Sequence, residues 1–283
     1  MGGAAVSLLS PALRKLEARM EASGSLLCVG LDPEVEKLAV QQYEGGGRGS
    51  VVSFCLQVAE LTAEFACAYK LNTAFFEARG SAGWRELESV MAGLRSACPD
   101  HFLICDAKRA DIGNTNRGYV RAVFDALGAD AITLHPYLGG GALEPFLARD
   151  DKASIVLCRT SNAGAGELQD LQSEGRPLWE TIAARVADQW NTRRNCMLVV
   201  GATWPAEMRR IRAIAPEMTF LVPGIGAQGG DVEAIVQAGL RADGKGLVIS
   251  SSRAILYADE PAKAARATRD AINGARERVH AGR

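Results

Sequence analysis

The stretch HFLICDAKRADIGNT (101–115) joins an apolar run to four charged residues within a few positions. A run that is apolar along its whole length is typical of a strand covered on both faces, as in a parallel sheet. Side chains alternate along a strand, so Asp106 and Lys108 are expected on one side and Arg109 on the other. Asp111 falls in the turn that follows. The stretch therefore predicts a buried strand that delivers charge to one end of a sheet.

Seven further runs of the same kind recur along the chain. They are LLCVGLD (26–32), FACAYKLN (65–72), ADAITLHPY (129–137), SIVLCRTS (154–161), CMLVVGAT (196–203), TFLVPGIG (219–226) and GLVISSSR (246–253). Amphipathic segments with helical spacing separate them, for example at 51–65, 84–97 and 177–190. Eight strand-then-helix units predict the α/β class and a (β/α)8 TIM barrel, and a doubly wound open sheet is the alternative.

No change in composition marks a second domain. We expect a single (β/α)8 barrel domain over 1–283, with its core at about 25–257. The Ala-rich, charged segment 261–283 is expected to form either a final barrel helix or a linker. The helix predicted at 11–20 precedes the first strand and should cover the floor of the barrel. An insertion at 162–177 should lie at the opposite end, because the catalytic loops of a barrel follow its strands.

The bulk composition argues against several classes of function. Lys and Arg number 32 against 33 Asp and Glu, a net charge of -1, which disfavours nucleic acid or an anionic membrane as a partner. The seven cysteines form no C-x-x-C pair and the three histidines lack zinc-ligand spacing, so we expect reduced thiols and no metal site. No apolar stretch reaches the roughly 18 residues of a membrane helix, and no signal peptide is indicated. A cytoplasmic protein is expected.

Charge also comes from the ends of the two strands that precede 101–108. Lys70 lies near the end of one run, and Asp32 ends the other within the motif GLDP. The carboxyl ends of neighbouring barrel strands meet at one rim. An ion-pair network that merely caps the barrel would explain any single pair, although such pairs stabilise a fold little. Four or five charges from three adjacent strands generally mark a site of chemistry.

These residues carry a resemblance to a known family. The stretch DAKRADIGNT resembles the D-x-K-x-x-D signature of the orotidine 5′-phosphate decarboxylases. Four other stretches occur in the family's order: GLDP (30–33), YKLNTAFFE (69–77), PGIGAQGGD (223–231) and SSR (251–253). The resemblance runs from about residue 25 to 257 and is greatest to the longer subgroup of the family, which carries KRxDIGNT.

The resemblance implies a decarboxylation of orotidine 5′-phosphate to uridine 5′-phosphate, in de novo pyrimidine synthesis, without a cofactor. It also implies a homodimer whose active sites are shared between the subunits. By motif, Lys70, Asp106 and Lys108 act within one subunit, and Asp111 and Thr115 reach into the site of the other.

The same resemblance implies a set of substrate contacts. Ser161 matches a serine that binds the pyrimidine, and Asp32 matches an acceptor for a ribose hydroxyl. Gln228 and Arg253 match contacts to the phosphate, and arginine can grip a phosphate with two hydrogen bonds. Asn72 lies on the same side of its strand as Lys70 and is a candidate contact to the ribose or to the charged row.

The chemistry of this decarboxylation indicates which kinds of residue must lie near the substrate. Loss of CO₂ from C6 leaves a carbanion in the plane of the ring, which the π system cannot delocalise. A cation at C6 must stabilise it, and Lys108 is the candidate for this role and for delivery of the proton. Asp106 would repel the departing carboxylate. Lys70 and Asp111 would keep Lys108 charged and oriented.

Other interpretations remain open from the sequence. Related sugar-phosphate decarboxylases and aldolases share D-x-K-x-x-D and use Mg²⁺, and a non-catalytic barrel that binds nucleotide is an alternative of another class. GIGAQGG (224–230) matches a dinucleotide-binding pattern, but it follows the seventh strand, where barrels commonly bind phosphate. Fusion to an orotate phosphoribosyltransferase, as in bifunctional uridylate synthases, is a further option.

Overall fold

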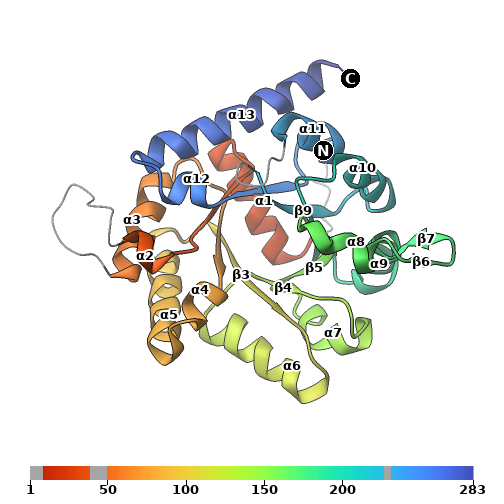
Figure 1. Ribbon diagram of the computed structural model, residues 1–283, viewed down its shortest axis with the longest axis horizontal. Helices are drawn as coiled ribbons and strands as arrows, with labels where there is room; N and C mark the ends of the chain where they lie inside the picture. The colour runs from red at the N-terminus through yellow and green to blue at the C-terminus, as the bar shows by residue number, and fades with distance from the viewer. Residues whose placement is uncertain (1–8, 39–49, 226–230, 283) are drawn as a thin grey trace, which may run out of the picture.

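The computed structural model describes residues 9–38, 50–225 and 231–282. Eight parallel strands close into a barrel in the order β1-β10-β9-β8-β5-β4-β3-β2, with helices around the outside (Figure 1). The strands are β1 Leu27–Gly30, β2 Ala68–Asn72, β3 Phe102–Arg109, β4 Ala131–Leu134, β5 Ala153–Arg159, β8 Cys196–Val200, β9 Thr219–Pro223 and β10 Leu247–Ser251. The predicted (β/α)8 barrel is therefore confirmed, and the open sheet is excluded.

Helices connect the strands and cover the barrel. They are α1 Pro11–Ser23, α2 Val35–Leu38, α3 Val51–Thr62, α4 Ala74–Glu77, α5 Gly80–Ala97, α6 Gly113–Val120, α7 Gly140–Leu147, α8 Gly166–Gln169, α9 Leu178–Arg185, α10 Pro205–Ile214, α11 Val232–Gly239, α12 Arg253–Leu256 and α13 Pro261–Ala281. From the sequence, the segment 261–283 is expected to be either a final barrel helix or a linker. Residues Pro261–Ala281 of it form α13, which packs against α3 and α11. No helix in the part of the chain that the structure describes is long and apolar enough to span a membrane.

The strands are buried on both faces, as their uniform hydrophobicity predicts. Every residue of β1, β4, β8 and β10 is buried, and these strands form one continuous core with the inner faces of the helices. Burial on both faces is the normal state of parallel strands that are covered by helices. The packed core therefore fixes the positions of the strand ends and of the side chains that they carry.

Helix α1 lies across the amino-terminal end of the barrel. Its Lys15 pairs with Asp130, which precedes β4, at 2.8 Å, and its Glu17 pairs with Arg241, which precedes β10, at 2.6 Å. These contacts join α1 to loops on different sides of the barrel floor. The expectation that the first helix covers the floor agrees with this placement, which leaves the carboxyl ends of the strands as the open end.

The insertion at 162–177 contains a short 3-10 turn, α8 and a two-stranded hairpin of β6 Gln172–Ser173 and β7 Arg176–Pro177. In Figure 1 the hairpin projects from the side of the barrel next to α8 and α9. Because it follows β5, the insertion lies at the open end of the barrel, as expected from the rule that catalytic loops follow the strands.

The contact between α4 and α5 fixes the segment that follows Lys70, and it gives a test of the packing. A Cβ atom at Gly83 of α5 would lie 1.8 Å from the carbonyl oxygen of Phe76 in α4. We expect Gly83→Ala to lower the free energy of unfolding by roughly 2 kcal/mol or more, since overpacking against backbone cannot be relieved by a side-chain rotation. Denaturant unfolding measures the change.

Gly274→Ala in α13 is the matched control. Only the end of the Arg278 side chain lies near its Cβ, at 3.5 Å, so replacement should stabilise the helix by roughly 0.5–1 kcal/mol. Equal effects of the two substitutions would show that the close approach of α4 to α5 is wrong.

Candidate active site

A cavity with two lobes opens at the carboxyl ends of the strands. One lobe, of about 550 Å³, runs from Lys108 to the insertion after β5, and the other, of about 540 Å³, runs from Asp32 to Arg253. Both lobes are lined by Lys70 and Pro223, so the two lobes adjoin. An elongated site of this kind suits a small molecule with two chemically different ends.

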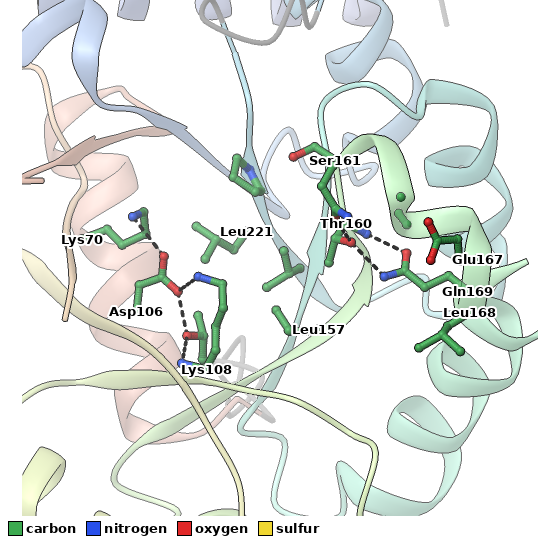
Figure 2. A pocket seen from close by; sticks show the side chains of 16 residues that line it. Lys70, Asp106, Lys108, Leu157, Thr160, Ser161, Glu167, Leu168, Gln169 and Leu221 are labelled. Atoms are coloured by element: carbon green, nitrogen blue, oxygen red, sulfur yellow. Dashed lines mark hydrogen bonds and ion pairs between the residues drawn. The ribbon is translucent and has the colours of Figure 1, made fainter. Parts of the chain in front are cut away.

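A row of alternating charges forms the wall at which the lobes meet. The Lys70 Nζ atom lies 3.6 Å from an Asp32 oxygen and 3.2 Å from Asp106 Oδ2, and the Lys108 Nζ atom lies 2.7 Å from Asp106 Oδ1. Figure 2 shows the Lys70, Asp106 and Lys108 part of this row. The order Asp32, Lys70, Asp106, Lys108 places each charge beside one of the opposite sign. The row therefore satisfies its charges internally, and its last member faces the cavity.

Burial differs sharply along the row. The side chains of Lys70 and Asp106 are 7% and 10% exposed, whereas that of Lys108 is 49% exposed. Burial acts to lower the pKa of Lys70, but Asp32 and Asp106 hold it above its ordinary value. Burial acts to raise the pKa of Asp106, but Lys70 and Lys108 outweigh it and lower this pKa to about 2. Both groups are therefore charged at neutral pH.

The backbone of β3 brings Asp106 and Lys108 to the same cavity in an unexpected way. The pairing of β3 with β4 shifts between Cys105 and Arg109, and Lys108 has a φ of 47°. A bulge of this kind re-aims the side chains that follow it and is common beside active sites. The predicted common side is correct, but regular alternation is not the whole reason. Arg109 turns away, as expected, and pairs with Glu77.

Thr133 of β4 supports the row and was not predicted. Its hydroxyl donates to Asp106 Oδ1 at 2.8 Å and accepts a hydrogen bond from the Lys108 backbone N–H at 3.0 Å. The only signal in the sequence is a single hydroxyl residue inside the apolar run AITL. Threonine is a common residue in strands, so this signal does not point to a functional role. The hydrogen bond from Lys108 to Thr133 lies within the bulge in β3, which the sequence does not indicate.

The lobe beside Lys108 has an apolar floor and a polar far wall. Leu157 and Leu221 lie between the charged row and the insertion in Figure 2, and Ser161 stands on the far side. Gln169 of α8 accepts a hydrogen bond from the Thr160 backbone N–H at 3.0 Å and donates to the Thr160 hydroxyl at 2.8 Å. The insertion thus forms part of the site, at the end of the barrel where the sequence predicts it.

The second lobe contains three further predicted substrate contacts, Asp32, Asn72 and Arg253. Asp32 accepts hydrogen bonds from the Asn72 backbone N–H at 3.0 Å and from the Ser252 hydroxyl at 2.8 Å, which hold its carboxylate at the cavity. The Asn72 side-chain oxygen accepts a hydrogen bond from the backbone N–H of Ala74, the first residue of α4. Arg253, the first residue of α12, is exposed. Asp32, Asn72 and Arg253 line this lobe together.

Two predicted residues, Asp111 and Thr115, do not line the cavity that the described residues of their own chain form. Half-buried Asp111 and exposed Thr115 lie in the segment after β3, where the Asp111 carboxylate accepts a hydrogen bond from the backbone N–H of Ile112 at 2.6 Å and the Asp111 carbonyl accepts one from the Asn116 side chain at 2.6 Å. Gln228 lies outside the described residues. The charged row and the contacts at Asp32, Asn72, Ser161 and Arg253 are thus brought together, whereas Asp111 and Thr115 are not.

The closed barrel and the charge row at its mouth define a (β/α)8-barrel enzyme, with its site at the carboxyl ends of the strands. Within the described ranges no group of three or more His, Cys, Asp or Glu side chains is arranged to hold a metal ion. The ammonium of Lys70 occupies the position between the carboxylates of Asp32 and Asp106.

The chain belongs to the orotidine 5′-phosphate decarboxylase / HUMPS family, whose sequence profile matches residues 25–268. The orotidine 5′-phosphate decarboxylase of Janthinobacterium sp. (strain Marseille) is 46% identical over 268 residues, or 92% of this chain and 97% of that protein. The resemblance inferred from the five motifs is therefore confirmed.

Solved structures agree with this assignment. Leishmania donovani OMP decarboxylase has a TM-score of 0.85 and 41% identity, over 95% of this chain and 100% of that chain. Leishmania donovani UMP synthase has the same TM-score and 43% identity, over 93% of this chain but only 56% of that chain. This chain therefore spans about half of that larger protein.

The charge row predicts a specific dependence of stability on pH. Because the pKa of Asp106 is lowered in the folded state, its contribution is complete above its unfolded value of 3.8 and is lost as the pH falls toward about 2. We expect the stability difference between the wild type and Asp106→Asn to shrink by roughly 2 kcal/mol between pH 5 and pH 2. Denaturant unfolding across this range measures it, and a constant difference would contradict the pairing.

Proposed function

We propose that the chain converts orotidine 5′-phosphate to uridine 5′-phosphate and CO₂, the decarboxylation that yields UMP in pyrimidine synthesis. The observation that carries this proposal is the charge row whose half-exposed final member, Lys108, faces the cavity beside the buried carboxylate of Asp106. The relatives described above, which are named orotidine 5′-phosphate decarboxylases, support it.

The row accounts for the chemistry without a cofactor. As the bond from C6 to the carboxylate breaks, its electron pair stays on C6, and the ammonium of Lys108 stabilises this charge and then donates a proton to C6. Asp106 lies where it repels a substrate carboxylate, and this repulsion is relieved when CO₂ leaves. Lys70, paired with both Asp32 and Asp106, holds both carboxylates in place and keeps Asp106 ionised. Water returns a proton to Lys108 after each turnover.

The two lobes match the two ends of the substrate. The pyrimidine occupies the lobe between Lys108 and Ser161, over the apolar floor. The ribose lies near Asp32 and Asn72, and the phosphate binds Arg253 with help from Gln228. Binding energy from the phosphate end then holds C6 at Lys108, because remote contacts can be used to orient the reacting centre.

The second part of the proposal is a homodimer with shared sites. Asp111 and Thr115 stay outside the cavity of their own chain, and two apolar residues at the same end of the barrel, Ile112 after β3 and Tyr137 after β4, are 64% and 84% exposed. A two-fold interface would place each segment at the cavity of the other subunit. Asp111 would then complete the row around Lys108 of its partner. The match over 97% of the Janthinobacterium orotidine 5′-phosphate decarboxylase supports activity of such a chain without a fused phosphoribosyltransferase.

Two substitutions separate chemistry from binding. Lys108→Ala should lower kcat by roughly 10⁴-fold or more, since it removes both the cation and the proton donor. Arg253→Ala should mainly raise KM, by roughly 10²-fold, because a charge-assisted contact to the phosphate is lost. The loss of orotidylate absorbance measures both. Near-normal turnover by the Lys108 variant would refute the mechanism.

A chelator distinguishes this reaction from the Mg²⁺-dependent reactions that share D-x-K-x-x-D. We expect full activity after treatment with EDTA, because the charges that surround the reacting carbon come from Lys108 and Asp106 themselves. Loss of activity in EDTA that Mg²⁺ restores would favour the sugar-phosphate alternative. Binding of uridylate without turnover of orotidylate would favour a binding module.

The shared site predicts complementation between two inactive variants. In a mixed dimer of Lys108→Ala and Asp111→Asn chains, one of the two sites has both native residues. Random exchange should therefore restore about one quarter of the wild-type activity, since half of the dimers are mixed and each has one native site. Assay after mixing and subunit exchange measures this, with each variant alone as the control. Continued inactivity of a mixture shown to contain mixed dimers would exclude sharing through Asp111.

A further inference from the structure

A buried guanidinium lies directly behind the far wall of the pyrimidine lobe. Arg159 is the last residue of β5, two positions before Ser161, and it is only 2% exposed. The pairing of β5 with β8 shifts between Leu157 and Arg159, so Leu157 lines the cavity whereas Arg159 does not. A buried arginine is costly to retain unless its position serves a purpose that a smaller apolar residue cannot serve.

The partners of Arg159 come from two separate segments. Its Nη1 atom lies 2.9 Å from Asp170, at the end of α8, and its Nη2 atom lies 4.0 Å from Glu207 of α10. The guanidinium carbon lies 4.0 Å from the centre of the Trp204 ring, in the loop that follows β8. Its Nε atom has no hydrogen-bond partner among the described residues. Charge pairing and stacking, rather than a complete set of hydrogen bonds, therefore hold this side chain.

The same two segments hold the backbone that presents Ser161. Trp204 donates its indole N–H to the Thr160 carbonyl at 2.8 Å, and Gly201 donates its backbone N–H to the Arg159 carbonyl at 2.7 Å. A Cβ atom at Gly201 would lie 2.8 Å from the Ser161 backbone nitrogen, so the β8 loop touches this turn directly. Gln169, which precedes Asp170 in the sequence, hydrogen-bonds to both the backbone N–H and the hydroxyl of Thr160.

We propose that Arg159 is a positioning residue for the pyrimidine lobe. It ties the insertion after β5, through Asp170, to the loop after β8, through Trp204, and so fixes the turn that carries Ser161. This inference rests on the proposed function, because it assigns the wall to pyrimidine recognition. The proposal also predicts a selective effect. Removal of the Arg159 contacts weakens binding of the pyrimidine and leaves binding at the lobe of Asp32 and Arg253 unchanged.

Direct binding of two ligands tests this selectivity. Calorimetry with uridine 5′-phosphate reports on both lobes, and calorimetry with ribose 5-phosphate reports on the phosphate lobe alone. For Arg159→Met, which keeps much of the volume but removes the charge, we expect the Kd for uridine 5′-phosphate to rise roughly tenfold or more, since a wall misplaced by about 1 Å loses its contacts. The Kd for ribose 5-phosphate should stay within about twofold of the wild type.

Further variants keep the outcome decisive. Asp170→Asn removes the exposed end of the same ion pair, so it decides the question if Arg159→Met fails to fold, and the same selective loss is expected. Arg149→Met is the matched control, because Arg149 also pairs with carboxylates and lies over an aromatic ring but contacts neither lobe. It should change neither Kd. Weakening of both ligands alike, or of neither, by the Arg159 and Asp170 variants would overturn the proposal.

Turnover of the wild type is measured separately. Absence of orotidylate turnover in the wild type would refute the proposed function. The ratio of the two dissociation constants does not depend on turnover, so the two failures can be told apart.

Discussion

The site depends on one constraint, which is the burial of the Lys70 ammonium between the carboxylates of Asp32 and Asp106. A buried ion of this kind is tolerated only when its partners are held in good geometry, and removal of one partner leaves an uncompensated charge. The barrel supplies that geometry, because β1, β2 and β3 are adjacent and in fixed register. The buried ammonium of Lys70 therefore depends on both carboxylates, and it helps in turn to keep Asp106 ionised.

The gradient of burial along the row gives its members different roles. Lys70 and Asp106 are enclosed and act on their neighbours, whereas Lys108 is half exposed at the cavity. Only a cation in this outer position can both contact a substrate atom and exchange a proton with water. The buried part of the row thus pre-organises Lys108, the group that we propose to react, and the Thr133 hydroxyl holds the backbone N–H of the same residue.

The fold could be predicted in full outline from the sequence, because eight apolar runs with helical segments between them have few ways to close. The meeting of the charged residues at one rim was also predicted, because D-x-K-x-x-D, Asp32 and Lys70 lie at the ends of three adjacent strands. The support from Thr133 and Arg159 was not, because both act through bulges in β3 and β5 that leave no local pattern. The partners that we propose for Asp111 belong to a second subunit, which no single chain contains.

The central claim is that an ammonium at the position of Lys108 performs the chemistry, and chemical rescue tests it most directly. Lys108→Cys should be inactive, and alkylation with 2-bromoethylamine should restore a side chain of nearly the same length that ends in an ammonium group. All seven native cysteines are buried, so the reagent should react selectively at the half-exposed position 108. We predict that alkylation restores decarboxylation of orotidylate. An alkylated, folded protein that stays inactive, or an untreated Cys variant with near-normal turnover, would contradict the account.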